Sequence, residues 1–533
     1  MRKVLLLVVV GASLVGASPA AAADSYFATV GGILTTGRMY AAAAPLPGGK
    51  VLVAGGYNGS TQPLTAEVYD PATDQFTETT NGPGGARTAP GLAPLPDGRV
   101  LLAGGQDGPT FLTSATIFDP VGGTFGGIPS TLSTARSGPG TAPLPDGSVL
   151  FAGGQSGLFS STQSTEAFNP DNQSFGGIPG DPQLSAPRVN AAAVALEDGR
   201  VLVVGGAEAS AASAEVYDPV AATFSGVPSA MTAGRSDPAA ALLGNGRVLV
   251  VGGDASAEIF DPATEKFTAI AATMSIPRDT PLAVPLANGT VLITGGYPGS
   301  GPTVPRSAEV FVPAPEARIK GAQPFGVVDV GTTTATRTVT ISNVGAQDLT
   351  MGSALTLSGD DPGDFVLGTN TCAGATLSFR DSCTIDVTFK PSADGARTAT
   401  IALATNEPTS SVVKLSGTGD APGTTTAPGT VSPPPPPATT PAGQTPTGTG
   451  VKVIPVKRVT CARKRVRGRT RITCTVKLTK PRAAKATLRR GKVVVARGRV
   501  TKGGRVTLTT ALKPKPGTYT LRIGTTKITI RLR

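Results

Sequence analysis

The amino-acid sequence predicts an all-β protein, dominated by a six-bladed β-propeller that its own N-terminal strand closes. Three observations predict this fold. A phrase of the type AEVYDPATDQF recurs six times, the last time in the incomplete form AEVFVPAPEAR, and a Gly-Gly pair closes an apolar run in every copy. The copies are spaced 43 to 52 residues apart, a period typical of propeller blades, each of which is a four-stranded antiparallel sheet.

The first half of each repeat predicts two strands joined by a tight turn. An arginine lies 17 residues before the first glycine of every pair, and these arginines are Arg38, Arg87, Arg136, Arg188, Arg235 and Arg278. After the arginine comes a strand of small residues such as AAAAPL, then a GG, DG or NG turn whose residues tolerate positive φ. The second strand is an apolar run such as VLVVGG, which we expect to be buried on both faces.

The second half of each repeat predicts the third and fourth strands. The third strand, of the type AEVYD, alternates inward and outward residues and ends at Asp-Pro. The fourth begins at a phenylalanine six residues after the Asp or Asn, and these are Phe76, Phe125, Phe175, Phe224 and Phe267. Because the innermost strands of a propeller crowd around the axis, we place the small-residue strand there and the aromatic residues outside. The Gly-Gly pair then lets neighbouring backbones approach without a Cβ clash.

The sixth repeat lacks its fourth strand, and the beginning of the chain supplies one. Phe27 lies 11 residues before Arg38, the same separation as in four of the five complete joints between repeats. We therefore predict that the N-terminal segment pairs into the sixth blade next to Phe311, closes the ring and hides its edges.

The repeats resemble kelch repeats, in which a Gly-Gly doublet after an apolar strand is followed by two aromatic residues at fixed offsets. We assign residues 24–318 to this propeller. The sequence departs from the family because phenylalanine stands where the fourth strand usually has tryptophan. The resemblance implies a binding platform, since only a minority of kelch propellers are enzymes.

Residues 319–419 predict a second domain, an immunoglobulin-like β-sandwich. Segments such as RTVTISNVG, CTIDVTFKP and TATIALATN alternate apolar and polar residues between turns. FGVVDVG, TISNVG, DFVL, CTIDVTFKP and the final LSGTG resemble the choice-of-anchor D domain of the ASPM/SPD-2/Hydin type. The resemblance implies an accessory domain of secreted or surface proteins, without a catalytic role. The acidic segment DDPGD at 360–364 invites calcium, but it lacks the spacing of a known loop, and a solvated turn is the preferred interpretation.

Residues 1–23 predict a secretory signal peptide. Arg2 and Lys3 precede an apolar run and an A-x-A site, which we expect to be cut after Ala23. An uncleaved membrane anchor is the alternative. No later stretch is apolar enough to span a bilayer, so we expect an exported, secreted or extracellular protein, associated with the cell envelope in one version of this hypothesis. Residues 420–450, rich in Pro, Thr and Gly, predict an extended linker.

Four cysteines predict two disulfides. The Pro-rich linker separates the second cysteine from the third, which favours the pairs Cys372–Cys383 and Cys461–Cys474. Four free thiols are the alternative, disfavoured outside the cytosol. Neither pair has C-x-x-C spacing, so we predict no zinc site, no other metal and no cofactor.

Residues 451–533 predict a small basic domain, with alternating segments such as RITCTVKLT that fit a second β-sandwich. It contains 26 Lys and Arg and no Asp or Glu, whereas residues 24–450 hold 19 basic and 35 acidic residues, a net charge of −16. A basic cluster opens the domain and is formed by Arg463, Lys464, Arg465, Arg467, Arg469 and Arg471. We predict that the domain binds an anionic polymer, such as acidic envelope polysaccharide, lipid headgroups or stray nucleic acid, without nucleic-acid specificity. A solvated basic surface without a partner is the alternative.

Residues that break the sixfold pattern are the best candidates for a ligand site. Two residues after each repeated arginine, near an entrance to the channel, the blades differ, with Tyr40, Ala89, Gly138, Asn190, Asp237 and Thr280. With Asp279, this position gives a one-sided polar patch, and we predict that Asn190, Asp237 and Asp279 contact a ligand. Hydrogen bonding between neighbouring blades is the alternative.

The absence of histidine removes the commonest general base and metal ligand, and it argues against galactose-oxidase-like copper chemistry. Asp-box motifs ending in tryptophan, typical of sialidase-like propellers, are also missing. We predict no catalytic residues and a recognition or adhesion protein, secreted or at the cell surface, whose propeller binds a glycan or protein while the basic domain tethers it to anionic envelope polymer. The alternatives are an extracellular polysaccharide-acting enzyme that uses two carboxylates, Asp237 and Asp279, and a structural surface component.

Overall fold

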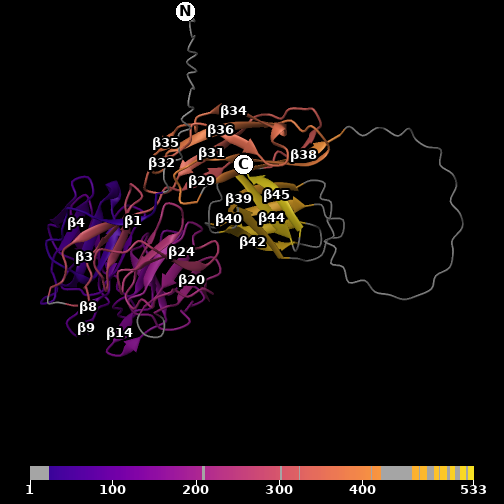
Figure 1. The fold of residues 1–533 in the computed structure, drawn as a ribbon. Coiled ribbons are helices and arrows are strands. Elements are labelled where there is room, and N and C mark those ends of the chain that lie inside the picture. Colours follow the sequence, from indigo (N-terminus) through magenta and orange to yellow (C-terminus); the bar gives the residue numbers. More distant parts are fainter. Residues whose placement is uncertain are drawn as a thin grey trace, which may run out of the picture. The chain divides into compact units, whose positions relative to one another are not determined.

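A computed structural model describes residues 23–421, apart from 207–210, 301–302, 323 and 410, and beyond residue 421 only the backbone of seven strands between 459 and 532 (Figure 1). Residues 1–22 of the predicted signal peptide and residues 422–450 of the predicted linker lie outside the described residues. The described residues confirm the all-β prediction. The chain forms two compact units, Met1–Thr424 and Thr425–Arg533.

Six four-stranded antiparallel sheets form the blades of the propeller, coloured indigo to magenta in Figure 1. Blades one to three contain, in spatial order, β2 (Met39–Pro45), β3 (Val51–Tyr57), β4 (Ala66–Asp70) and β5 (Gln75–Glu78); β6 (Gly91–Pro94), β7 (Val100–Ala103), β10 (Ala115–Asp119) and β11 (Thr124–Gly127); and β12 (Gly140–Pro143), β13 (Val149–Ala152), β16 (Thr165–Asn169) and β17 (Ser174–Gly176). Blades four to six contain β18 (Ala192–Ala195), β19 (Val201–Val204), β20 (Ala214–Asp218) and β21 (Thr223–Gly226); β22 (Ala239–Leu242), β23 (Val248–Val251), β24 (Ala257–Asp261) and β25 (Lys266–Ile270); and β26 (Leu282–Pro285), β27 (Val291–Thr294), β28 (Ala308–Val312) and β1 (Tyr26–Thr29).

Among the described residues, five short elements accompany the six blades. Two hairpins follow the Gly-Gly pairs of blades two and three, and a 3-10 turn joins the first two strands of blade one. These elements are β8 (Gln106–Asp107) with β9 (Thr110–Phe111), β14 (Gln155–Gly157) with β15 (Ser160–Ser161), and η1 (Pro47–Gly49).

The N-terminal strand closes the ring, as predicted. β1 pairs antiparallel with β28, and the register sets Phe27 opposite Phe311. The centroids of these two rings lie 5.1 Å apart. In the other five blades the equivalent aromatic pairs, between the third and fourth strands, lie 4.8 to 4.9 Å apart. Phe27 therefore takes the place that the fourth-strand phenylalanine has in every other blade.

The core of the propeller lies between the blades. Six separate apolar clusters each combine buried residues of two neighbouring blades, and the last of them joins blade six to blade one. The first strands of neighbouring blades also contact one another all around the axis. Their mostly small side chains fit this crowded position, whereas the paired Phe and Tyr rings lie on the third and fourth strands.

A buried arginine network explains why the 17-residue spacing never varies. In every blade the arginine Nη1 donates to the carbonyl oxygen of the first glycine of the pair, over 2.6 to 2.9 Å. The N–H of the second glycine donates to the backbone carbonyl of the arginine in the next blade, over 2.7 to 3.2 Å, and Gly296 to Arg38 completes the circle. Each arginine thus braces its own blade with its side chain and binds the preceding blade with its backbone.

The first glycine of the pair must be a glycine. Gly55 has φ 72°, in the left-handed region, and a Cβ built on it would lie 2.6 Å from the carbonyl oxygen of Arg87 in the next blade. The predicted close approach of neighbouring backbones is therefore present.

Five of the six arginines pair with a buried glutamate. Arg136 is typical, because its Nε lies 3.0 Å from Glu166, whose carboxylate also accepts from the N–H of Ser133 at 2.7 Å. The other pairs are Arg38–Glu67, Arg188–Glu215, Arg235–Glu258 and Arg278–Glu309. Every member of these pairs is buried, so each charge depends on its partner.

Blade two replaces the glutamate with a backbone carbonyl. Thr116 stands at the glutamate position, and Arg87 Nε donates instead to the carbonyl of Pro83 at 3.1 Å. Gly84 and Gly85 follow with φ of 80° and 118°, a conformation that few other residues adopt. Burial lowers the pKa of Arg87, partly offset by the Asp107 carboxylate.

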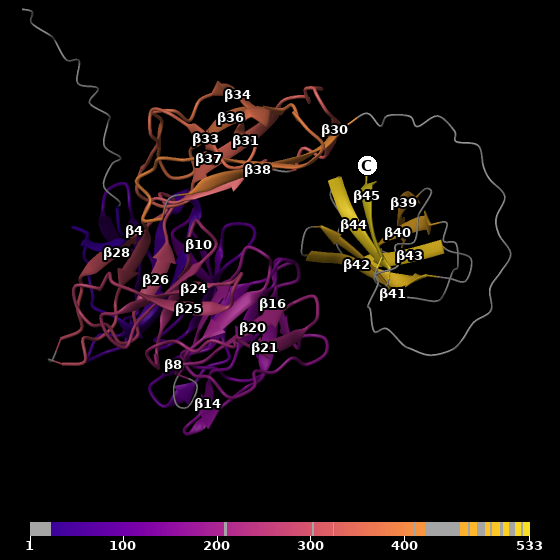
Figure 2. The same cartoon turned by 45° about the vertical axis from the view of Figure 1, so that its right-hand side comes forward.

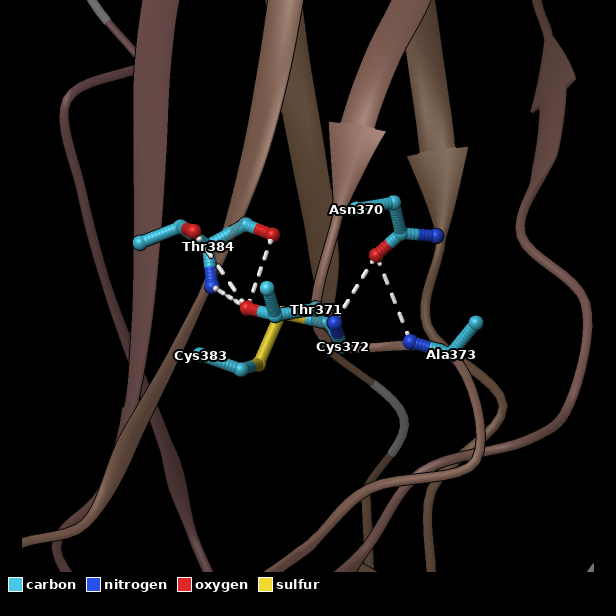
Figure 3. The surroundings of a disulfide bond; sticks show 6 residues. All are labelled: Asn370, Thr371, Cys372, Ala373, Cys383 and Thr384. Carbon is cyan, nitrogen blue, oxygen red and sulfur yellow. Dashed lines mark hydrogen bonds between the residues drawn. A yellow bond between two sulfur atoms is a disulfide. The ribbon is translucent and has the colours of Figure 1, made fainter.

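The second domain is a two-sheet sandwich with a disulfide (Figures 2 and 3). One sheet has the order β29 (Ala317–Lys320), β31 (Arg337–Asn343), β36 (Ser382–Phe389) and β34 (Phe365–Asn370), and the other β30 (Val327–Asp329), β38 (Val412–Asp420), β37 (Gly395–Ala402) and β33 (Thr356–Ser358). Three short elements accompany the two sheets, β32 (Leu349–Thr350) with β35 (Thr376–Leu377), and η3 (Pro362–Asp364).

The disulfide Cys372–Cys383 confirms the first predicted pair and joins the buried core of the sandwich. Asn370 Oδ1 accepts from the backbone N–H groups of Cys372 and Ala373, at 2.8 and 3.3 Å, and so holds the turn that carries Cys372 (Figure 3). The DDPGD segment pairs with Arg397 through Asp361, and Asp364 is buried rather than solvated. The preferred interpretation of a solvated turn is therefore wrong for Asp364, because the segment folds against β37.

The sandwich contacts the propeller at the turns between first and second strands. Glu316 accepts from Asn245 Nδ2 at 2.8 Å and from Arg247 Nη2 at 2.7 Å, both in the blade-five turn. Arg318 Nη2 donates to the carbonyl of Gly244 at 3.1 Å and lies 3.3 Å from the blade-four residue Glu197.

The second unit contains seven strands that hydrogen-bond in one continuous order, and their bounds are β39 (Val459–Val466), β40 (Arg469–Val476), β43 (Arg505–Thr510), β42 (Val493–Val500), β41 (Lys485–Arg490), β44 (Gly517–Ile523) and β45 (Thr526–Leu532). The register of β39 and β40 sets the backbone of Cys461 opposite that of Cys474. Their side chains lie outside the described residues, so this second disulfide stays a prediction.

The buried ion pairs should dominate the stability of single blades. We expect Glu166→Ala to lower the free energy of unfolding by about 3–5 kcal/mol, because it leaves Arg136 buried without its carboxylate. Thr116→Ala, at the same position of blade two, should cost about 1 kcal/mol, because the Pro83 carbonyl remains. Urea denaturation of the full chain, followed by circular dichroism, measures both. Equal losses would show that the carboxylate is not what holds the arginine.

Candidate functional site

The six positions two residues after the arginines form a ring at one mouth of the propeller channel. Five of the six residues, all but Asp237, have a left-handed backbone, with φ between 48° and 63°. The N–H of Ala89 donates to the Tyr40 carbonyl at 2.7 Å, Gly138 to Ala89 at 2.7 Å, and Asn190 to Gly138 at 2.8 Å. The ring therefore links the first four blades through their backbones.

Side chains replace backbone links in the remaining arc of the ring. Asn190 Nδ2 donates to Asp237 Oδ1 at 2.6 Å, and Thr280 Oγ1 accepts from the N–H of Tyr40 at 3.1 Å. The structure thus brings Asn190 and Asp237 together. This contact joins two neighbouring blades, as the alternative interpretation expected, and both residues also line the channel.

Asp279, the third predicted residue, lies beside the ring rather than in it. Its backbone forms a bridge with Tyr297, with N–H to carbonyl distances of 2.7 and 2.8 Å in the two directions. Its carboxylate is nevertheless close enough to act on the groups of the ring. It raises the pKa of both Asp237 and Tyr40.

The pKa values of both carboxyls in the polar patch are raised above their ordinary value. Burial raises the pKa of Asp237, the Asn190 hydrogen bond opposes this shift, and the charge of Asp279 adds to it. Burial also raises the pKa of Asp279. Burial raises the pKa of Tyr40, and Asp237 and Asp279 raise it further. No lysine or arginine is among the described residues that line the channel, so no cation offsets these charges.

Below the ring lies a cavity of about 180 Å³ with walls of small residues. Ala41, Ala42 and Ala43 belong to blade one, and alanines of blades four to six continue the wall. The cavity is narrow, so a ligand of more than a few atoms would contact the mouth and enter only in part. The arrangement offers hydrogen-bond acceptors from Asp237 and Asp279, an amide from Asn190 and the phenol of Tyr40.

Tyr40 is the residue that sequence reasoning placed in the ring but left out of the ligand set. The signal was present, because Tyr40 is the only aromatic residue among the six ring positions. Within the described residues, no cluster of three or more His, Cys, Asp or Glu could hold a metal ion. In the same part of the chain, no helix is long and apolar enough to cross a membrane.

The basic cluster of the second unit lies on one strand pair. Arg463, Lys464 and Arg465 belong to β39, and Arg469 and Arg471 belong to β40, where the register sets Lys464 opposite Arg471. Arg467 lies outside the described residues. Five of the six predicted polymer-binding positions thus share one two-stranded ribbon, and their role stays a prediction.

The raised pKa of Asp237 makes a pH-dependent prediction. Because the folded state raises this pKa, ionisation of Asp237 destabilises the fold as pH rises from about 3 to about 7. Asp237→Asn removes that effect and keeps an acceptor for Asn190, so its melting temperature relative to wild type should rise over this pH range.

Asp181→Asn, on an exposed loop, is the matched control for loss of one negative charge. Thermal melts of the three proteins at both pH values measure the effect. A change of the same size in the control would mean that general charge, rather than the ring environment, is responsible.

Two family models match the chain. The model of the Kelch motif matches residues 38–83, which contain β2 to β5 of blade one. The model described as Abnormal spindle-like microcephaly-assoc'd, ASPM-SPD-2-Hydin (ASH) matches residues 310–413, which contain most of the sandwich. No curated protein matches the chain. Both resemblances inferred from the sequence are thereby confirmed, and the chain carries a kelch-type β-propeller joined to an ASH domain, a combination that indicates a protein-interaction module.

Proposed function

We propose that this protein is an extracellular recognition or adhesion protein whose propeller binds a glycan or protein ligand at the mouth formed by the ring. One observation carries the proposal. The six blades differ at the ring, and the polar residues gather on the side formed by blades four to six and Tyr40. A propeller that served only as a spacer would need no such asymmetry.

The mouth is on the opposite side of the blades from the ASH domain. Asp237 and Thr280 lie two residues before β22 and β26. The contacts with the ASH domain are instead at turns that follow first strands, at Glu197, Gly244 and Gly289. The ASH domain therefore leaves the mouth open. This arrangement suits a module that presents one face to a ligand and anchors the other.

Two observations support an extracellular location. The disulfide Cys372–Cys383 is typical of oxidising compartments, and the first 23 residues have the composition of a secretory signal. The basic domain at residues 451–533 would then hold the acidic remainder of the protein near an anionic envelope polymer. Five arginines and lysines on the β39–β40 ribbon supply its densest positive charge.

An enzyme that hydrolyses extracellular polysaccharide is the second candidate. The raised pKa of Asp237, next to the carboxylate of Asp279, is the property that a general acid needs. A structural surface component is the third, and it would assemble without any ligand at the mouth.

Ligand capture at the mouth is the first test. We expect the full chain to bind members of a glycan and peptide array, and the double variant Asp237→Asn/Asp279→Asn to lose at least tenfold in affinity for them, because both carboxylate acceptors lose their charge. Asp171→Asn/Asp181→Asn, at exposed turns, is the control with the same net charge. Capture without product supports recognition, whereas product formation that the first double variant abolishes supports the enzyme.

Tethering is tested by truncation. A chain that ends at Ala421 should lose binding to anionic envelope preparations that the full chain binds at low salt, because it lacks the basic domain. Binding of the full chain should fall as salt rises from about 0.05 to 0.5 M, since screening weakens exposed charges. Equal sedimentation of both proteins with the envelope at low salt would contradict the tether.

A further inference from the structure

A second cavity, of about 420 Å³, lies where the ASH domain meets the propeller turns. Its propeller side comes from the ends of the first strands, and the turns that follow them, in blades four to six, and includes Glu197, Leu242 and Leu286. Its ASH side includes Val344, Phe379 and Lys320. The volume lies within the range of ligand pockets, and it is more than twice that of the channel mouth.

The floor of this junction cavity is apolar and held in place. Phe379 packs so closely against two propeller turns that a Cβ built on Gly244 or Gly289 would lie 2.5 or 2.7 Å from its ring atoms. Arg318 joins the same turns through the Gly244 carbonyl and Glu197. The glycines in these two turns therefore allow Phe379 to dock, and they fix the shape of the cavity.

The rim of the cavity carries three basic side chains and one carboxylate. Arg318 pairs with that carboxylate, Glu197, over 3.3 Å, whereas Lys320 and Arg380 form no ion pair within the described part of the chain. Arg380 lies over the Phe379 ring at 4.9 Å and has a left-handed backbone, φ 71°, held by a 2.9 Å hydrogen bond to the Asn343 carbonyl. Residues with a strained backbone cluster at functional sites, and an arginine at such a position offers N–H donors to a carboxylate.

We propose that the junction cavity binds an acidic peptide segment, with an apolar side chain against the leucines and the valine that line the cavity and a carboxylate between Lys320 and Arg380. Charge complementarity supports the acidic occupant. A sugar fits less well, because the Arg380 guanidinium lies over the one aromatic ring of the cavity, and the two glycine turns pack against that ring. Leu242, Leu286 and Val344 suit a leucine or phenylalanine side chain instead.

The test uses the full chain and an array of hexapeptides that combine glutamate with leucine or phenylalanine. A matched array replaces glutamate with glutamine. We expect binding at 0.15 M salt on the acidic array only, and a loss of at least tenfold in affinity for the double variant Lys320→Gln/Arg380→Gln. Both side chains are exposed, so the variant should keep the melting temperature of the wild type.

The matched control is Lys266→Gln/Lys414→Gln, which removes two positive charges from exposed positions on β25 and β38. The control should bind like wild type, and the difference between the two double variants cancels any contribution of the basic domain. Three results would overturn the proposal: no binding to the acidic array, equal losses in both double variants, or junction-dependent binding of uronic-acid oligosaccharides in place of peptides.

Discussion

The buried arginine of each blade is the constraint on which the propeller depends. Its side chain holds the Gly-Gly turn of its own blade, and its backbone carbonyl accepts from the Gly-Gly turn of the blade before it. A buried guanidinium is costly without partners, so the glutamates, or Pro83 in blade two, are needed to satisfy it. Six similar polar clusters therefore stabilise the propeller, in addition to the six apolar clusters between its blades.

The same network positions the mouth. The ring residues come two positions after the arginines, so the braced arginine places each of them at the channel entrance. In the first four blades, backbone hydrogen bonds link neighbouring ring positions. In the rest of the ring the side chains of Asn190, Asp237 and Thr280 take part, so the identity of these side chains sets the chemistry there. The side chains at the mouth can thus vary while the arginine network, and with it the fold, remains.

The two ends of the propeller differ in their contacts and in their charged groups. The turn end contacts the ASH domain through Glu316, Arg318 and Phe379, away from the mouth. The mouth holds two carboxyls with raised pKa, Asp237 and Asp279, whereas the junction cavity holds two basic side chains without an acidic partner in the described part of the chain, Lys320 and Arg380. The two proposed ligand sites therefore lie at opposite ends of the propeller.

The sequence by itself determined the six blades, the closing strand at Phe27 and the pair Cys372–Cys383, because each follows from a repeat count, a fixed spacing or a short loop. Only the tertiary structure decided how blade two dispenses with its glutamate, that Asp364 is buried, that Asn190 bonds to Asp237, and where Phe379 docks. These features depend on contacts between segments that share no periodic pattern. The direction of the Asp237 pKa shift belongs with them, because burial and the neighbouring charge of Asp279 arise only when blades five and six stand side by side.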